Sequence, residues 1–429
     1  MELLFELIAG KRVLILGFGA EGRSTYKYIK QTGAFSKLGI ADVKPVSDLP
    51  GCVIHSGSGY LDNIENYDVV FKSPGIVLPK NYKDYSCIIT SQTEVFLKAY
   101  GRQVIGITGT KGKSTVASLL YHVLYSNNIR CLFAGNIGIP VFDIAKDMSP
   151  GAAAVLELSC HQLEICGVSP AAAVLLNLYE DHLDHYGTYA NYIKAKKNIY
   201  LHQQPSDILY CGENVKPARG ESVSRTVVVN KDMLPFGSLK DVDGVRLRGE
   251  HNLVNCAFVY SIAKTFGITD DEFTAALKSY IPLRHRLEFI GNRNGVDYYD
   301  DSISTTVEST INAVETVQNI STLLLGGMDR GIDYSFLAEY LSKSGLSVII
   351  CMYESGKKIF EMLKSCEKMK PVCVLCENLP EAIKTAKKLT PPGTACVLSP
   401  AAASYGDFKD FKERGDMFKS MVFDDTAEG

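Results

Sequence analysis

The chain has 429 residues, of which 46% are hydrophobic and 22% charged, with a net charge of −3. This is the composition of a globular protein long enough for two to four domains. The near-neutral charge, with acids and bases interspersed, argues against a nucleic-acid partner, and no apolar run reaches the roughly 18–20 residues of a membrane span.

The N-terminus and the cysteines favour the cytoplasm. The first residues lack the basic segment and cleavage site of a signal peptide. The twelve cysteines are scattered, which indicates reduced thiols. The one C-x-x-C pair, Cys373 and Cys376, lies in an alternating apolar run and is interpreted as a buried strand rather than a metal or redox motif.

Short apolar strands, glycine turns and helical patterns recur along the chain and predict an α/β protein. We expect three domains, covering residues 1–99, 100–281 and 282–429. The first and third are predicted to be Rossmann-like doubly wound sheets, and the second a P-loop domain. The polar, turn-rich stretch 205–245 is expected to form small β-hairpins.

In the first block, strand Arg12–Leu16 runs into a turn with glycines at 17, 19 and 22, and a helix follows at Ser24–Lys30. Asp42 ends the next strand. Taken alone, this spacing is the fingerprint of an NAD site and supports an NAD-dependent oxidoreductase. The same turn can hold any diphosphate, so the alternative is a nucleotide-diphosphate substrate.

The second block opens with strand Gln103–Thr108 and the glycine-rich loop G-I-T-G-T-K-G-K-S, which ends at Ser114 and starts a helix. In this context the backbone N–H groups face phosphates, Lys113 neutralises them and Ser114 can bind Mg²⁺. The loop is one residue longer than the strict Walker pattern. It predicts an ATP site.

A metal site is expected near this loop. A divalent cation must bridge the ATP phosphates and any second anion that is bound beside them. Mg²⁺ prefers oxygen ligands, and Glu157, at the end of a strand, can hold one ion together with Ser114. His182 follows a neighbouring strand, and a hydrogen-bonded loop histidine is its alternative interpretation. Asn252 and Asn255, one helical turn apart, suit adenine.

The third block contains strands at Val296–Tyr299, Thr322–Leu325, Leu346–Cys351 and Ala395–Leu398. A hinge near Pro282 would let Arg286 reach the γ-phosphate, where guanidinium matches the charge of phosphoryl transfer. An interface arginine is the alternative. Asp301 is expected to accept from the ATP ribose or from adjacent groups.

The phosphate-loop variant G-x-T-G-T-x-G-K-S resembles the Mur ligase superfamily, and further segments match it in order. They are S-P-G-I at 73–76, G-N-I-G at 135–138, E-L-S-C-H-Q-L-E at 157–164, D-H-L-D at 181–184, Ala195-Lys196, G-E-H-N at 249–252, His285-Arg286, Asp301-Ser302 and L-S-P from 398. The combination looks like the branch that adds glutamate.

This resemblance implies an ATP-dependent amide ligase of peptidoglycan precursor synthesis, which joins glutamate to UDP-N-acetylmuramoyl-L-alanine through an acyl phosphate. D-glutamate is the expected amino acid, with L-glutamate as the alternative. A folylpolyglutamate synthase-like ligase and a non-catalytic nucleotide-binding partner of a cell-wall complex are further alternatives. We expect a monomer that uses ATP and two Mg²⁺ ions.

The resemblance also implies residue roles. Lys196 would be carbamylated, which turns a cationic lysine into an oxygen ligand for metal. The catalytic residues would be Lys113, Glu157, His182, Lys196 and Arg286, and the metal ligands Ser114, Glu157, His182 and Lys196. ATP would contact Gly109, Thr110, Lys111, Gly112, Lys113, Ser114, Thr115, Asn252, Asn255, Arg286 and Asp301.

The UDP-substrate would contact Gly19, Ala20, Glu21, Asp42, Ser73, Pro74, Gly75 and Asn136. The amino acid would contact Thr305, Arg330, Ser404, Tyr405 and Phe411. This sequence departs from the family in the amino-acid pocket, because Ile303 stands where many members have lysine. Arg330 is expected to supply the missing cation.

Overall fold

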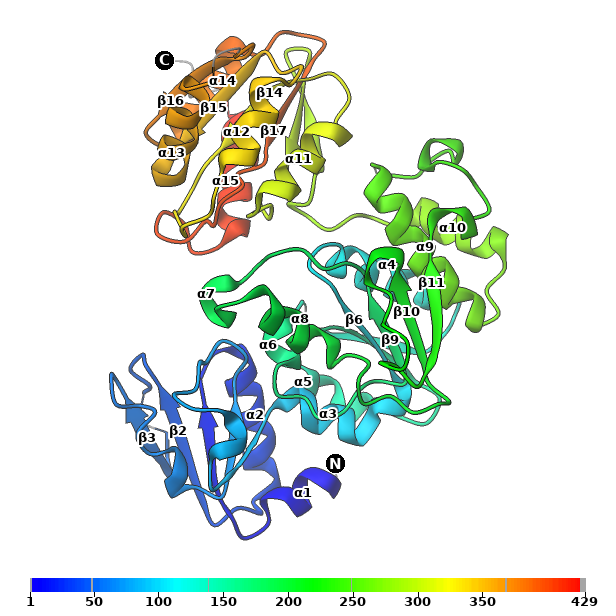
Figure 1. Cartoon of the computed structure of the whole chain (residues 1–429), viewed down its shortest axis with the longest axis vertical. Helices are drawn as coiled ribbons and strands as arrows, with labels where there is room; N and C mark the ends of the chain where they lie inside the picture. Colours follow the sequence, from blue (N-terminus) through cyan, green and yellow to red (C-terminus); the bar gives the residue numbers. More distant parts are fainter. Residues whose placement is uncertain (1, 48, 138, 248, 367–368, 425–429) are drawn as a thin grey trace. The chain divides into compact units, whose positions relative to one another are not determined.

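The computed structural model describes residues 2–47, 49–137, 139–247, 249–366 and 369–424. The chain forms two compact units, one of Met1–Gly237 with Val254–Ser279 and the other of Ser238–Leu253 with Tyr280–Gly429. Three sheets are present, two in the first unit and one in the second (Figure 1). The expected α/β class is confirmed, and the expected domain boundaries at 99 and 281 stay predictions.

The first sheet is parallel, with the strand order β3-β2-β1-β4-β5. Its strands are β1 (Arg12–Leu16), β2 (Lys37–Asp42), β3 (Cys52–Ser56), β4 (Val69–Lys72) and β5 (Ile88–Thr90), and its helices are α1 (Glu2–Ile8), α2 (Ala20–Thr32) and α3 (Gln92–Tyr100). The strand order reverses between β1 and β4. In doubly wound sheets ligands bind at such a switch point, outside the carboxyl ends of the strands.

The second sheet is also parallel, in the order β11-β10-β9-β6-β8-β7. Its strands are β6 (Val104–Thr108), β7 (Cys131–Gly135), β8 (Ala153–Glu157), β9 (Ala172–Leu175), β10 (Ile208–Gly212) and β11 (Arg225–Val229). The α-helices are α4 (Lys113–Ser126), α5 (Val141–Ile144), α6 (Cys160–Leu163), α7 (Leu183–Tyr186), α8 (Tyr189–Lys197), α9 (Glu250–Thr265) and α10 (Asp270–Ser279).

The predicted hairpins at 205–245 are wrong. β10 and β11 pair in parallel and extend the second sheet, with Ile208 opposite Arg225. Their polar, turn-rich connection suggested local antiparallel pairing. However, β10 pairs in parallel with β9, which is distant in sequence, and β11 then adds beside β10 in the same direction; a local pattern reveals neither pairing.

The third sheet has the order β12-β13-β17-β14-β15-β16, in which only the β12–β13 pair is antiparallel. The strands are β12 (Glu288–Arg293), β13 (Val296–Asp300), β14 (Ile320–Leu325), β15 (Val348–Met352), β16 (Val372–Cys376) and β17 (Ala395–Leu398). The helices are α11 (Val307–Thr316), α12 (Ser335–Ser342), α13 (Tyr353–Lys364), α14 (Leu379–Leu389) and α15 (Phe411–Phe423). Apolar clusters cover both faces.

The run with Cys373 and Cys376 is a strand, but it is not buried as predicted. β16 is the edge of the third sheet, and Val372 and Leu375 are exposed. An alternating apolar pattern fits an edge strand as well as a central one. Among the described residues, no helix is long and apolar enough to cross a membrane.

Candidate active site

The glycine turn after β1 is tightly packed at Gly17 and Gly22 but open at Gly19. Gly17 has φ +91°, and a Cβ there would lie 2.7 Å from the Cβ of Ser73, whose hydroxyl donates to the Gly17 carbonyl. A Cβ on Gly22 would lie 2.0 Å from the same carbonyl. By contrast, no atom of the described residues lies within 4 Å of a Cβ built on Gly19. The turn therefore leaves open space at the N-terminus of α2, where a diphosphate can bind.

The other predicted UDP contacts from the first sheet lie around this turn, at the carboxyl ends of β1, β2 and β4. Asp42 Oδ2 accepts from the backbone N–H of Phe18 at 2.6 Å, and its Oδ1 accepts from Lys44 N. Ala20 and Glu21 begin α2, and burial raises the pKa of Glu21 to about 7. Ser73, Pro74 and Gly75 follow β4.

The phosphate loop joins β6 to α4 and needs two of its glycines. Gly109 has φ +157° and Gly112 φ +85°. Lys113 Nζ folds over the loop and donates to the carbonyls of Gly109 and Thr110, both at 2.9 Å. Asn177, after β9, holds the loop from the side, because its Oδ1 accepts from Lys111 N at 2.8 Å and its Nδ2 donates back to Lys111 O. Asn177 belongs to a segment that resembles the Mur ligases, but no role was predicted for it.

Glu157 ends β8 beside this loop and is almost fully buried. Its Oε1 accepts from Asn136 Nδ2 at 2.7 Å, whereas its buried Oε2 has no hydrogen-bond partner among the described residues. Leaving a buried carboxylate oxygen unpaired costs free energy. A divalent cation would satisfy it, and Ser114, in the first turn of α4 next to Thr115, offers a second oxygen. The residues therefore fit the predicted Mg²⁺.

Lys196, on α8, is 1% exposed, and its Nζ donates to Gly109 O at 2.8 Å. The amine also lies 4.8 Å from the ring centroid of Tyr192, whose hydroxyl is 2.9 Å from Thr110 Oγ1. Burial, reinforced by the nearby charge of Lys113, lowers the pKa of Lys196 to about 7. Burial therefore favours the neutral form of this amine.

His182 precedes α7 in a left-handed conformation, φ +53° and ψ +35°. Such a backbone costs about 1–3 kcal/mol in a non-glycine residue and occurs often at functional sites. Its ring centroid lies 4.8 Å from that of His161, which in turn lies 4.5 Å from His185. Burial lowers the pKa of His161 to about 3. His185 Nε2 lies 3.4 Å from Glu164 Oε2.

The sequence analysis named His182 but not this cluster around it. His161 and Cys160 open α6, some twenty positions earlier in the chain, and no spacing rule connects the two segments. Only the fold brings them together.

Of the two predicted adenine contacts, Asn255 lies against the phosphate loop. It is buried on α9, and a Cβ built on Gly112 would lie 2.6 Å from its Oδ1. Asn252, on the same helix, belongs to the second compact unit.

In the second unit, Arg286 stands between two residues with left-handed backbones, His285 at φ +62° and Leu287 at φ +49°. Two adjacent aspartates fix them. His285 Nδ1 lies 2.7 Å from Asp300 Oδ2, and Leu287 N donates to Asp301 Oδ1 at 3.0 Å. Asp301 Oδ2 accepts from Ser399 Oγ. Asp301 therefore accepts from adjacent groups, and its contact with ribose stays a prediction.

The predicted amino-acid contacts lie in loops and a helix start that follow adjacent strands of the third sheet. Thr305 follows β13, Arg330 follows β14, and Ser404 and Tyr405 follow β17, ahead of Phe411 at the start of α15. The guanidinium of Arg330 lies 5.8 Å from the ring centroid of Tyr405. The fold thus gathers these residues at the carboxyl edge of the sheet.

Arg414 connects these loops through hydrogen bonds, and it was not predicted from the sequence. It is fully buried on α15 and donates to the hydroxyl and carbonyl of Ser302 and to the carbonyls of Ala402 and Ala403. An arginine in a helix usually indicates a solvated face, so its sequence context gave no signal.

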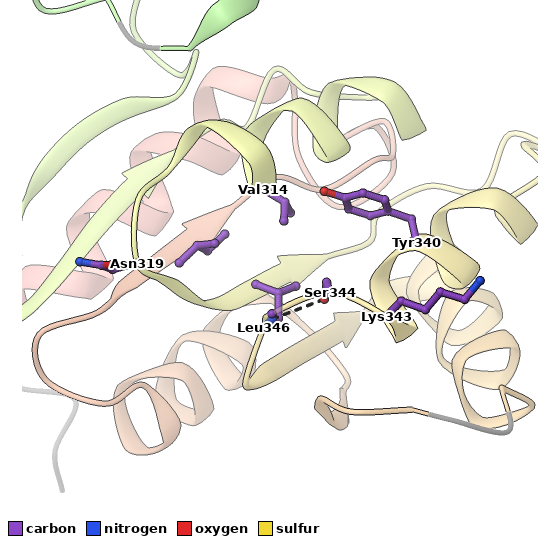
Figure 2. A pocket seen from close by; sticks show the side chains of 8 residues that line it. Val314, Asn319, Tyr340, Lys343, Ser344 and Leu346 are labelled. Atoms are coloured by element: carbon purple, nitrogen blue, oxygen red, sulfur yellow. Dashed lines mark hydrogen bonds between the residues drawn. The ribbon is translucent and has the colours of Figure 1, made fainter. Parts of the chain in front are cut away.

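A hollow of about 460 Å³ also exists in the second unit (Figure 2). It is lined by Val314, Asn319, Ile320, Tyr340, Lys343, Ser344, Gly345 and Leu346. Ile320 begins β14 and Leu346 precedes β15, so the hollow lies at the amino ends of the strands. Ligands of doubly wound sheets bind at the carboxyl ends, and we assign this hollow no role.

Known proteins resemble this chain over nearly its whole length. Residues 107–227 match the Mur ligase middle domain, and residues 285–402 match the Mur ligase, glutamate ligase domain. The chain is 30% identical, over 97% of both chains, to the UDP-N-acetylmuramoylalanine--D-glutamate ligase of Clostridium botulinum (strain Kyoto / Type A2). The chain belongs to the Mur ligase family.

Solved structures of Mur ligases share the fold. MurF from Acinetobacter baumannii superposes with a TM-score of 0.62 at 14% identity, covering 97% of this chain and 91% of that one. MurF from Thermotoga maritima, in complex with ADP, gives 0.60 at 18% identity, with coverages of 97% and 96%. The Mur ligase fold thus extends over nearly the whole chain, including the first sheet, which neither domain match covers.

Proposed function

We propose that this Mur ligase joins D-glutamate to UDP-N-acetylmuramoyl-L-alanine with ATP, releasing ADP and phosphate, as a cytoplasmic monomer. The observation that carries the proposal is the arrangement around Gly109, where Lys113 and Lys196 converge on the phosphate loop with the unpaired Glu157 oxygen on the neighbouring strand. The full-length similarity to a D-glutamate ligase supports the choice of substrates.

Different residues would bind the UDP-substrate, the ATP and the transferred phosphoryl group. The turn at Gly19 binds the substrate's diphosphate, with Asp42 close to the nucleoside. The phosphate loop binds ATP, and Lys113 releases its two carbonyl contacts to bind the γ-phosphate. Arg286 adds a second positive charge as phosphoryl transfer to the alanyl carboxylate proceeds, because guanidinium matches the charge spread over the phosphoryl oxygens.

Mg²⁺ would be held by Ser114, Glu157, His182 and a carbamylated Lys196, and it would neutralise phosphate charge. The carbamate forms only from a neutral amine, and the lowered pKa of Lys196 supports this step. Its nitrogen keeps one hydrogen with which it can still donate to Gly109.

The amino acid binds at the carboxyl edge of the third sheet. Arg330 holds a carboxylate of glutamate in place of the lysine that Ile303 replaces, with Thr305, Ser404, Tyr405 and Phe411 around it. The glutamate amine, once deprotonated, attacks the acyl phosphate. The amide bond forms as phosphate leaves.

Phosphate release tests the function directly. Purified protein with ATP, Mg²⁺ and UDP-N-acetylmuramoyl-L-alanine is assayed with D-glutamate and L-glutamate separately. We expect phosphate and the UDP-muramoyl dipeptide only with D-glutamate. Turnover with L-glutamate alone would assign the other branch, and tight NADH binding without ligation would contradict the proposal.

A further inference from the structure

We propose that Cys160, His161 and His182 form a binding site for a thiophilic divalent metal, of which Zn²⁺ is the best fit. One ligand atom from each residue, the Cys160 Sγ and an imidazole nitrogen of each histidine, lies within 4.8 Å of the others. No oxygen ligand is in this set, so the site differs in chemistry from the Mg²⁺ site of Ser114 and Glu157.

The Cys160–His161 pair already has the spacing that a tetrahedral metal imposes. Zinc bonds to sulfur at about 2.3 Å and to nitrogen at about 2.0–2.1 Å. At a tetrahedral angle, the two ligand atoms lie about 3.5–3.6 Å apart. The observed separation between Cys160 Sγ and His161 Nδ1 is 3.6 Å. His182 is half-exposed, so a side-chain rotation can complete the set.

The local structure holds two of these ligands in place. α6 starts with a capping box, in which the Ser159 hydroxyl accepts from Gln162 N and the Gln162 side chain accepts from Ser159 N. Cys160 and His161 therefore stand on a fixed helical turn. Three protein ligands leave a fourth position for water, as in zinc sites with an open coordination position.

A third histidine and an acidic side chain lie next to His161 without joining the proposed ligand set. The ring of His185 packs edge-on against His161, and its Nε2 lies 3.4 Å from Glu164 Oε2. Lys72 donates to the same carboxylate oxygen at 3.3 Å. Glu164 contacts His185 and Lys72 rather than a proposed ligand, so it orients the side chains around His161. A thiolate with two imidazoles selects Zn²⁺ or Co²⁺ over Mg²⁺.

Binding is tested with Co²⁺ on the full-length, metal-free protein. We expect one Co²⁺ per chain, with a thiolate-to-cobalt charge-transfer band and tetrahedral visible bands that Zn²⁺ abolishes. Cys160→Ser should remove the charge-transfer band, and His161→Phe should weaken binding at least about tenfold, since loss of even an outer-shell partner of a metal ligand costs about 10–100-fold in affinity. Cys166→Ser is the matched control, since Cys166 is equally buried but outside the cluster, and should keep the band.

The proposal would be overturned if the parent protein showed no charge-transfer band. It would also be overturned if the band persisted in the Cys160→Ser variant. These spectra need no turnover, so they stand apart from the proposed ligase activity.

One consequence rests on the proposed function. If His182 is also a ligand of Mg²⁺, then Zn²⁺ bound at Cys160 and His161 would recruit His182 and remove this ligand from the Mg²⁺ centre. Micromolar Zn²⁺ should then inhibit phosphate release with excess Mg²⁺ present, and Cys160→Ser should be at least about tenfold less sensitive. Equal inhibition of both proteins would contradict this sharing.

Discussion

The Nζ atom of Lys196 donates a hydrogen bond to the carbonyl oxygen of Gly109 at 2.8 Å. A buried amine is thereby attached to the loop that is expected to hold the phosphates. The contact uses a single hydrogen, so an uncharged amine can still make it.

The lowered pKa of Lys196 predicts a pH dependence of stability. Between about pH 7, its pKa in the folded protein, and about 10.4 in the unfolded chain, the unfolded state binds more protons. The free energy of unfolding should therefore rise with pH across this window in CO₂-free buffer, by at most about 1.4 kcal/mol per pH unit. Urea denaturation at pH 7 and pH 9 measures it.

Lys196→Met should abolish this rise and phosphate release together, because it removes both the titrating group and the carbamate. Lys194→Met is the matched control, since Lys194 is exposed on the same helix. Bicarbonate should raise the melting temperature of the parent and of the Lys194 variant only. A Lys196 variant that keeps full activity would contradict the carbamate.

Glu157→Gln should remove Mg²⁺-dependent ATP binding, because an amide replaces the unpaired buried oxygen. Asn136→Ala should weaken the apparent Mg²⁺ affinity about 10–100-fold, since its amide orients the ligand without binding metal. Calorimetric titration of ATP at several Mg²⁺ concentrations measures both. Glu213→Gln, at an exposed glutamate after β10, serves as the control, and an equal loss there would indicate a general charge effect.

Arg330→Ala should raise KM for glutamate by ~30–150-fold, which corresponds to about 2–3 kcal/mol for a carboxylate left without its charged partner. KM for ATP should change little. Arg286→Ala should instead lower kcat, because its contact strengthens as phosphoryl charge develops. Steady-state kinetics with Arg219→Ala, an exposed control, separates these cases. An unchanged KM for glutamate would show that another group replaces the lysine.

Arg414→Lys should cost about 2–4 kcal/mol of folding free energy, because an ammonium cannot reach all the oxygens that the guanidinium serves. KM for glutamate should rise as well, since the loops after β13 and β17 lose their common brace. Arg284→Lys, at an exposed arginine, should be close to neutral. Urea denaturation with both variants checks the difference, and equal stability would refute the role of Arg414.

What could be predicted from the sequence was local. The turn at Gly17 and the loop at Gly109 are short segments whose glycines, lysine and flanking strand act together, and the structure places them at strand ends as expected. What failed depends on partners distant in the chain. β10 and β11 were predicted as hairpins because the pairing of β10 with the distant β9 cannot be seen locally, and the cluster around His161 was missed because the fold alone joins it to His182.

Asp300, which ends β13, and the following Asp301 have a mechanical consequence. Asp300 and Asp301 contact the residues on either side of Arg286. The chain then continues to Thr305, and on the way the carbonyl of Ser302 accepts from the guanidinium of Arg414. Arg286, expected to contact phosphate, and the loops expected to hold glutamate are thus connected through the same segment of chain. A motion that repositions Arg286 would then also displace the loops around Thr305, which would couple the proposed phosphoryl transfer to glutamate binding.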